Sequence, residues 1–445
     1  MPKITHRKKR LSSFKLIVLG FAGVIVLGAL VLMLPFSSTA GVVTPFHEAL
    51  FTSTSAVCVT GLVVQDTGSY WSAFGQTVIL LLIQIGGLGV VTVAALFAML
   101  SGRKISLMQR STMQDAISAP KVGGIVRLTR FIVRGTFLIE LIGMIVMLPT
   151  FCGNYGFKGI WMAAVHSVSA FCNAGFDILG TAENKYPSLT GYIGNPAINI
   201  AIMLLIIVGG IGFLTWDDIY TNKWHFKKYR MQSKVILVTT AILIIVPAVF
   251  FFFCDFTGLP LAERILASLF QSVTPRTAGF NTADLPAMTG SSKAIMTMLM
   301  LVGGSPGSTA GGMKTTTLAV LILSAFSVCR KKDDAEVCGR RIDGSAVKNA
   351  AAVAVMYFLL FFVGGIVIST AEGLPLSTCL YETASAVGTV GLTLGITPQL
   401  GVLSQLILIV LMYLGRVGGL TLIYAAVSNK NHSGAKLPLE KITVG

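Results

Sequence analysis

The apolar positions of this chain form long hydrophobic runs that are separated by short polar segments. Five runs reach roughly 20 residues, the length that crosses the hydrocarbon core of a bilayer. They are Leu16–Leu34, Ala73–Leu100, Ile236–Cys254, Ala350–Ile368 and Val402–Val427. Two shorter runs, Gly135–Phe151 and Ile198–Leu214, continue the same pattern. The pattern predicts an all-α integral membrane protein in which spanning helices follow one another in pairs.

Each predicted pair of spanning helices encloses a shorter, partly apolar stretch that ends in a glycine motif. The four stretches are ALFTSTSAVCVTGL (49–62), AAVHSVSAFCNAGF (163–176), ASLFQSVTPRTAGF (267–280) and CLYETASAVGTVGL (379–392). At about 13 residues they are too short to span a bilayer, and their length fits re-entrant segments. Because such backbone is tolerated at membrane depth only where it is buried in protein or lines water, we expect the four stretches to meet at one pathway.

The glycines of these motifs, Gly61, Gly175, Gly279 and Gly391, recur at intervals of roughly 110 residues, which indicates internal repeats. We therefore expect four pseudo-symmetric helix–pore helix–helix repeats around one central ion pore. The expected repeats are 16–100, 127–215, 233–328 and 347–428. The expected linkers are 101–126, 216–232 and 329–346, and the terminal segments are 1–15 and 429–445.

Composition and charge add an orientation to this picture. Of the 445 residues, 54% are hydrophobic and 12% are charged, against about a quarter charged in soluble domains, and the net charge is +16. Lys and Arg concentrate in the linkers and the terminal segments, and short loops rich in these residues stay in the cytoplasm. This predicts a multi-pass protein of the cell membrane with cytoplasmic N- and C-termini and glycine motifs on the outer face. We expect no nucleic-acid partner, because no linker is long enough to form a basic domain.

The glycine motifs have the chemistry of a cation pathway. Four strands of backbone can replace the hydration shell of an ion with rings of carbonyl oxygens, and glycine adopts the backbone angles that point successive carbonyls inward. The C-terminal ends of the short helices add partial negative charge at the same place. The predicted ion-binding residues of this selectivity filter are Val59, Thr60, Gly61, Leu62, Asn173, Ala174, Gly175, Phe176, Thr277, Ala278, Gly279, Phe280, Thr389, Val390, Gly391 and Leu392.

Small hydroxyl residues precede each motif and can brace the loops by hydrogen bonds, with ordinary intrahelical bonding as an equally favoured alternative. They are Thr52, Ser53, Ser55, Ser167, Ser169, Ser272, Thr383 and Ser385. The third stretch differs in spacing, because Ser272 precedes Gly279 by seven residues where the corresponding serines of the other stretches precede their glycines by six. We therefore expect Pro275-Arg276 to bulge the approach to the third motif, and the sequence does not indicate how Arg276 avoids repelling an ion.

On these features the chain resembles the Trk/Ktr/HKT family of potassium transporters over nearly its whole length. The resemblance rests on the four motifs Val59–Leu62, Asn173–Phe176, Thr277–Phe280 and Thr389–Leu392. The compact length and the stretches PRTAGFNT and GGSPGSTAGGMKT look most like the KtrB-type membrane subunit of bacterial Ktr systems. Members of the family with Ser at the first glycine tend to favour sodium, so Gly61 implies potassium.

The resemblance also implies partners. It implies a homodimer in membrane lipid with one pore per subunit, and a cytosolic ring of RCK (KTN) subunits of the KtrA type that binds ATP or ADP and regulates the pore. Because the chain has no dinucleotide-binding fingerprint, we expect no organic cofactor in it; the ions concerned are potassium and, as an activator left open, sodium. The expected docking surfaces for the RCK subunits are Arg103–Arg110, Lys223–Arg230, Arg330–Arg341 and Lys436–Gly445.

The second helix of the third repeat is interrupted by a dense run of helix breakers between Ala294–Val302 and Thr315–Val328. A lipid-facing helix cannot contain such a run. The run nearly fits a phosphate loop, but Met313 precedes Lys314 and no soluble βαβ unit surrounds it. We expect segment 303–314 to obstruct the pathway, which resembles the intramembrane gating loop of the Ktr and Trk proteins. The predicted gate residues are Gly303, Gly304, Gly307, Gly311, Gly312, Lys314 and Arg416.

Charged residues near the pathway have more than one interpretation. Arg416 lies inside an apolar run, where a charge must face protein or water. One interpretation is a structural ion pair, with Glu140 as the candidate partner. The other, which the family resemblance implies, is a positive barrier beside the loop. Lys314 acts likewise or extends toward the cytoplasmic side, and we favour the second interpretation. Acidic residues on the outer face can concentrate cations. They are Glu48, Asp66, Asp177, Glu263, Asp284 and Glu382.

Two other classes of function compete with a pore. A sodium- or proton-coupled potassium symporter also has repeats and broken helices, although its repeats are often inverted, whereas these four share one orientation. A membrane-embedded enzyme needs a convergent set of acid, base or nucleophilic groups. The ionisable candidates show no such pattern: Glu140, His166, Lys314 and Arg416. We therefore predict a potassium uptake pore and not an enzyme.

Overall fold

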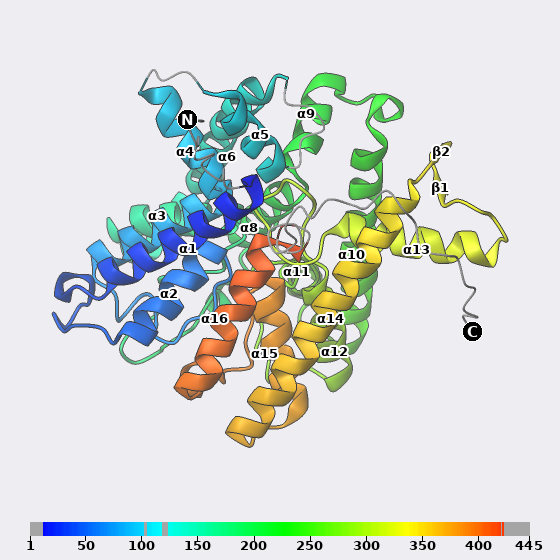
Figure 1. Cartoon of the computed structure of the whole chain (residues 1–445). Coiled ribbons are helices and arrows are strands. Elements are labelled where there is room, and N and C mark those ends of the chain that lie inside the picture. The colour runs from blue at the N-terminus through cyan, green and yellow to red at the C-terminus, as the bar shows by residue number, and fades with distance from the viewer. Residues whose placement is uncertain (1–11, 102–104, 118–122, 420, 422–445) are drawn as a thin grey trace, which may run out of the picture.

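The computed structural model describes residues 12–101, 105–117, 123–419 and 421, and it is almost entirely helical (Figure 1). The first half contains α1 (Ser13–Leu32), α2 (Phe46–Cys58), α3 (Ala73–Leu88), α4 (Val90–Leu100), α5 (Leu107–Ile117), α6 (Ile125–Tyr155), α7 (Lys158–Phe171), α8 (Pro196–Gly210) and α9 (Phe213–Asn222). The second half contains α10 (Met231–Cys254), α11 (Leu261–Val273), α12 (Gly290–Leu301), α13 (Thr315–Cys329), α14 (Gly344–Glu372), α15 (Leu376–Gly388) and α16 (Val402–Val417). Short 3-10 helices lie in the loops: η1 (Pro35–Ser37), η2 (Thr190–Tyr192), η3 (Phe226–Lys228) and η4 (Thr397–Gln399).

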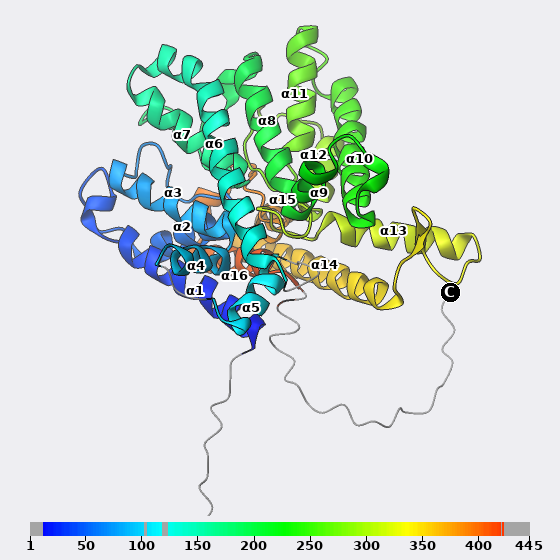
Figure 2. The same ribbon diagram turned by 90° about the horizontal axis from the view of Figure 1, so that it is seen from above.

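The order of elements repeats four times: a long helix, a short helix, an extended loop and a further helix. The long helices are α1, α6, α10 and α14, and the short helices that follow them are α2, α7, α11 and α15. Seen from above, the four sets of helices surround a common centre (Figure 2). The short helices and their loops are the buried part of the molecule, and most of their residues are inaccessible to solvent.

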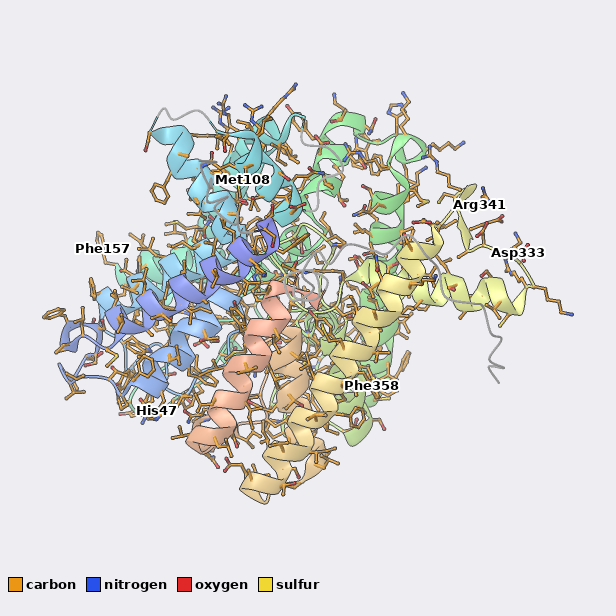
Figure 3. All side chains as sticks on the ribbon, in the orientation of Figure 1. His47, Met108, Phe157, Asp333, Arg341 and Phe358 are labelled. Carbon is orange, nitrogen blue, oxygen red and sulfur yellow. The ribbon has the colours of Figure 1, made fainter. Side chains whose placement is uncertain are left out.

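The four long helices are the clearest membrane spans. Each has an 18-residue window with a mean hydropathy between 2.1 and 2.9. Among the described residues, the number of candidate spans rises from four to six if each of two bent helix pairs is taken as one span. Their outward faces carry exposed apolar side chains such as Phe358 of α14, which is 54% exposed (Figure 3). An exposed apolar face on a helix of spanning length fits contact with lipid, so the helical membrane fold that the sequence predicts is confirmed.

A small hairpin is the exception to the helical architecture of the described residues. β1 (Glu336–Val337) pairs antiparallel with β2 (Arg340–Arg341) in the third linker. Together with α13 it projects from the body of the molecule in both views (Figures 1 and 2). Asp333 and Arg341 lie at this projecting end (Figure 3), where Arg341 forms an ion pair with Asp334 at an N–O distance of 2.9 Å.

The apolar runs Ala73–Leu100 and Ile198–Leu214 each contain a break that the hydropathy pattern does not indicate. α3 and α4 are bent by 96° at Gly89, and α8 and α9 are bent by 98° near Gly212. Helix α16 stops at Val417, so the predicted run to Val427 is also interrupted, at Gly418. The three glycines share one conformation, with φ of 84°, 91° and 86° and ψ of 133°, 140° and 139°. Residues with a Cβ are strained there, which is why each break lies at a glycine.

Candidate functional site

At most three residues separate the end of each short helix from a glycine motif. α2, α7, α11 and α15 stop at Cys58, Phe171, Val273 and Gly388, and the chain continues as an extended loop. We call the four segments 59–62, 173–176, 277–280 and 389–392 the motif loops. Almost every residue in the motif loops is buried, and none of their side chains is charged. The structure therefore brings together all sixteen residues that the sequence predicts to bind an ion.

The glycines of the four motif loops close a ring, in which each glycine lies against the loop of the next repeat. A Cβ added at Gly175 would lie 2.6 Å from the carbonyl oxygen of Ala278, far inside van der Waals contact. The other three glycines are equally crowded by a neighbouring carbonyl: Gly61 by Ala174, Gly279 by Val390 and Gly391 by Thr60. We call this arrangement the glycine ring. Any side chain in it would displace the backbone of the neighbouring loop.

The backbone of each motif loop leaves ordinary β geometry at two positions. The glycines have φ of 93°, 68°, 82° and 96° in chain order. The residue two positions earlier also has a positive φ in every loop: Val59 at 59°, Asn173 at 59°, Thr277 at 72° and Thr389 at 52°. Val59, Thr277 and Thr389 are β-branched, and positive φ in such a residue is a strained conformation that persists only where the surroundings enforce it. The sequence predicts the positive φ at the glycine, but it does not indicate the positive φ two residues earlier.

The hydroxyl groups before the motifs have two different roles. Ser55 and Ser385 brace their loops, because their Oγ atoms each accept a hydrogen bond at 3.0 Å from the backbone N–H of the ring glycine, Gly61 or Gly391. Four others tie each short helix to the long helix before it by donating to a backbone carbonyl. The pairs are Ser53 with Ile25 (2.7 Å), Ser167 with Glu140 (2.5 Å), Ser272 with Ile244, and Thr383 with Phe361 (3.2 Å). The Oγ atoms of Thr52 and Ser169 have no partner among the described residues.

These bonds correct the prediction for the third motif. Ser272 is the counterpart of Ser53, not of Ser55, because both donate to the preceding long helix. Counted from that hydroxyl to the ring glycine, the third repeat is therefore one residue shorter than the first, and it does not contain an extra residue. Thr274 takes over the bracing, with its hydroxyl donating to the carbonyl of Phe280. Arg276 is buried, and its guanidinium lies 3.5 Å from the hydroxyl of Thr240 on α10. The charge thus extends toward α10.

A cavity of about 230 Å³ lies on one side of the glycine ring. Its lining includes all four ring glycines and two of the six acidic residues that the sequence singles out, Asp66 and Asp177. Asp66 is held in place, because its carboxylate accepts hydrogen bonds from the backbone N–H groups of Ser69 (2.8 Å) and Tyr186 (2.9 Å). The other four acidic residues do not line this cavity: Glu48, Glu263, Asp284 and Glu382.

The segment Val302–Lys314 between α12 and α13 lies against the glycine ring; we call it the interhelical loop. A Cβ at Gly311 would overlap the hydroxyl of Thr389 in the fourth motif loop. The two ends of the interhelical loop pair with each other, since the N–H of Gly303 donates to the carbonyl of Met313 at 2.7 Å. The predicted break between two helices is confirmed, and it places a closed loop directly beside the ring.

The interhelical loop also rests on the bend between α8 and α9. The N–H of Ser305 donates to the carbonyl of Gly210 at 2.9 Å, and the N–H of Phe213 donates to the carbonyl of Gly307 at 2.7 Å. The hydroxyl of Thr309 donates to the carbonyl of Phe171, the last residue of α7, at 3.1 Å. The loop is therefore tied to the second repeat mostly through backbone groups.

Arg416 ties the interhelical loop to the first and fourth repeats. Its guanidinium donates to the carbonyl oxygens of Thr309 in the loop and of Gly86 and Gly87 at the end of α3. Among the described residues Arg416 forms no ion pair, and the carboxylate of Glu140 instead accepts a hydrogen bond from Gln84 at 3.3 Å. The ion pair with Glu140 is thus not formed, and the positive charge lies beside the loop.

Lys314 does not extend away from the pathway, so the interpretation we favour from the sequence is wrong. Its ammonium group turns back onto the interhelical loop and donates to the carbonyl oxygens of Ala310 (2.8 Å) and Gly311 (3.3 Å). Lys314 and Arg416 both line a cavity of about 290 Å³ on the side of the loop away from the ring, as does Ile117 at the end of α5. The interhelical loop therefore separates the glycine ring from a second cavity.

Known proteins similar to this chain identify its family. Residues 23–433 match the TrkH family, described as cation transport protein. The chain belongs to this family. It is 39% identical to the potassium/sodium uptake protein NtpJ of Enterococcus hirae, over 98% of both chains, and 37% identical to the Ktr system potassium uptake protein B of Bacillus subtilis, over 92% of both chains. The crystal structure of the potassium transporter TrkH from Vibrio parahaemolyticus has the same fold, with a TM-score of 0.74 at 19% identity, covering 96% of this chain and 87% of that one.

A recurring glycine pattern in this TrkH-family chain marks the helix breaks and flanks Arg416, and the repeat motifs alone do not reveal it. Gly-Gly-aliphatic-Gly occurs at 86–89 and 209–212, and Gly415-Arg416-Val417-Gly418 has the same form with Arg416 in place of the second glycine. The first glycine of each set contacts a short helix, because a Cβ there would overlap the carbonyl of Val57, Phe171 or Val387. This recurrence is the signal that could have located all three breaks.

Proposed function

We propose that this chain carries potassium into the cell through the glycine ring, and that the interhelical loop gates the path. The observation that carries the proposal is the position of the ring between two cavities, with the interhelical loop against one side of it. The names of the relatives, a potassium/sodium and a potassium uptake protein, support potassium as the ion. Gly61 at the first ring position agrees with that assignment.

None of the side chains in the motif loops is charged, so backbone groups would form the proposed ion path at the ring. Backbone carbonyls of the motif loops replace water around the ion, and the C-terminal ends of α2, α7, α11 and α15 contribute partial negative charge. Asp66 and Asp177, which line the cavity above the ring, raise the local concentration of cations. The positive-φ residues indicate that the surrounding packing holds the backbone geometry of the motif loops.

The gating role of the interhelical loop rests on its charges and its contacts. Lys314 and Arg416 place two positive groups beside the route from the ring to the second cavity, and a positive charge there opposes the passage of a cation. The loop is rich in glycine, and side-chain contacts from Arg416 and Thr309 hold it. Release of these contacts would let the loop move aside.

Regulation by a separate cytosolic partner is part of the proposal. The basic linkers would lie on the cytoplasmic side and dock the RCK subunits with their ATP or ADP, and two copies of the chain would form a homodimer. Lys223–Arg230 and Arg330–Arg341 are exposed for such docking, whereas Arg103 and Lys436–Gly445 lie outside the described residues. The contact of Ile117 in α5 with the interhelical loop, where a Cβ at Gly307 would overlap the carbonyl of Ile117, offers a route from the first linker to the gate.

A coupled symporter is the second candidate, because helices bent by 96° and 98° are typical of transporters with broken helices.

An enzyme is not proposed. His166 packs between Phe151 and Phe280, with ring centroids at 5.0 and 6.1 Å, and within the described residues no three His, Cys, Asp or Glu side chains gather as a metal site would require.

Rubidium-tracer uptake into potassium-loaded liposomes that carry the purified protein tests the proposal. We expect uptake that excess external potassium blocks and excess sodium blocks weakly, with no need for a sodium or proton gradient. Uptake that required an inward sodium gradient would favour the symporter. Absence of any cation uptake, with and without the RCK subunits, would refute both.

A further inference from the structure

Three arginines on α6 lie outside the proposed ion path. Arg127, Arg130 and Arg134 are spaced three and four residues apart, so they share one face of the helix, and all three are exposed. Among the described residues none of them forms an ion pair or a hydrogen bond through its side chain. We call them the arginine row. Like charges at this spacing repel one another, so an anion beside them would stabilise the row.

The arginine row lies where the headgroups of a bilayer would be. Below it the same face of α6 continues with Phe137, Leu138 and Leu141, which are 53%, 58% and 52% exposed. From Gly135 to the end of α6 the helix has about 20 residues, or roughly 30 Å, which matches the hydrocarbon core of a bilayer. The three arginines occupy the two turns just outside that core.

A cavity of about 610 Å³ opens beside the row, between the start of α6 and α9. Arg127 lines it together with Phe131 and Tyr220, whose ring centroids are 5.4 Å apart. Arg230 also lines it, but that guanidinium is neutralised by Asp217 at an N–O distance of 2.8 Å. Arg127 thus brings an unpaired positive charge to a cavity with an aromatic wall, and a guanidinium binds phosphate oxygens in pairs.

Helix α9 and the residues after it have the character of an interfacial segment. The 98° bend after α8 turns α9 away from the direction of the preceding span. Tyr220 is 74% exposed and Trp224 is 96% exposed, and Lys223 and Lys227 stand beside them in the sequence. Exposed aromatic and basic side chains on a segment that leaves a span are typical of chain lying among lipid headgroups.

We propose that the arginine row and the adjoining cavity bind the phosphate headgroup of an anionic phospholipid. The lipid is favoured over a soluble partner because the arginines continue directly into the lipid-exposed apolar face of the same helix, so one molecule can place its headgroup on Arg127 and its chains along Phe137 and Leu141. The site is independent of the ion path, since none of its residues lines either cavity next to the glycine ring.

Native mass spectrometry of the purified full chain, titrated with phosphatidylglycerol or phosphatidylcholine, tests the site. We expect a preference for phosphatidylglycerol of about tenfold or more, given the attraction of each basic residue to an anionic lipid. The variant Arg127→Gln/Arg130→Gln/Arg134→Gln should lose this preference, and the corresponding triple Arg→Lys variant should keep most of it. The variant Arg330→Gln/Lys331→Gln/Arg340→Gln removes the same charge from the end of α13 and the adjoining hairpin, and it should bind like the unaltered chain.

Three outcomes would overturn the proposal. One is an equal phosphatidylglycerol preference in the triple Gln variant of α6 and the unaltered chain, with both folded by size-exclusion chromatography. A second is displacement of phosphatidylglycerol by inorganic phosphate at millimolar concentration, which would mark a simple anion site. The third is a triple Gln variant that keeps the lipid preference but no longer binds the RCK subunits, which would assign the row to a protein partner.

Discussion

The glycine ring and the interhelical loop are neighbours, yet different kinds of contact hold them. In the ring, backbone lies against backbone, and the missing side chain of each glycine makes room for the carbonyl of the next motif loop. The interhelical loop also forms backbone hydrogen bonds with the bend between α8 and α9, and the side chains of Thr309 and Arg416 add hydrogen bonds to carbonyl oxygens. We infer that close packing on all sides fixes the proposed filter, whereas the proposed gate depends on polar contacts that a conformational change can release.

The largest effect should come from placing a side chain in the ring. Gly391→Ala puts a Cβ onto the carbonyl of Thr60 and onto a backbone at φ 96°, so we expect rubidium uptake to fall by about 100-fold or more. The matched control is Gly395→Ala, which has φ 91° but no atom within 4 Å of the added Cβ. Equal losses in the two variants would mean that backbone strain, and not the closed ring, matters.

Release of the gate should have the next largest effect, in the opposite direction. Arg416→Gln removes the charged hydrogen bonds to Thr309 and Gly86, and hydrogen bonds to a charged group contribute about 1.5–3 kcal/mol each. We expect uptake in the absence of the RCK subunits to rise about tenfold. Arg340→Gln, on the projecting hairpin, should leave uptake unchanged. A fall in uptake with Arg416→Gln would contradict the gating role.

A single neutral hydrogen bond of the interhelical loop should have a smaller effect. Thr309→Val removes the 3.1 Å bond to the carbonyl of Phe171 at nearly constant volume, at a cost of about 1 kcal/mol to the closed position. We expect uptake without the RCK subunits to rise about threefold to fivefold. Thr215→Val is the control, because that buried hydroxyl has no partner among the described residues. The same rise in both variants would argue against the tether.

The contacts that support the ring should affect stability more than transport. Ser272→Ala removes the bond from α11 to the carbonyl of Ile244, which should lower the free energy of unfolding by about 1 kcal/mol and the Tm by about 2 °C. Ser169→Ala, whose Oγ has no partner in the described part of the chain, should leave the Tm unchanged. Thermal unfolding of the two variants in detergent would decide, and a lower Tm in Ser169→Ala alone would refute the assignment.

The smallest effect should come from Arg276, although it lies directly before the third motif loop. Its guanidinium lies toward Thr240 on α10, so Arg276→Met should keep the competition of potassium over sodium within about twofold of the unaltered chain, because a charge behind protein is not a ligand of the path. A larger change in that ratio would show that the arginine acts on the ion.

The repeats and the ring glycines were predictable because the same motif recurs four times at the same place between apolar runs. Hydropathy could not reveal the bends, since Gly89 and Gly212 lie within continuous apolar sequence and their unusual φ leaves no trace in side-chain polarity. The alignment of Ser272 failed for a related reason. A hydroxyl can donate to a carbonyl on the next helix or accept from the loop, and only the packed structure decides which.

The partners of Arg416 and Lys314 were equally hidden. A charge in an apolar run suggests an acidic partner, and the sequence offers Glu140. In the structure both basic side chains donate to backbone carbonyls. Every residue has a carbonyl group, so the residue types in a sequence do not indicate which carbonyl accepts. Sequence reasoning thus placed these charges near the interhelical loop but could not assign their contacts.

Passage of the ion through the glycine ring can be tested by competition of potassium and sodium against rubidium uptake in liposomes. The variants are Gly61→Ser and Gly279→Ser, with Gly395→Ser as the control. We expect both ring variants to lose discrimination between potassium and sodium while the control retains it. Ring variants that transport with the unaltered ratio would place the ion path elsewhere.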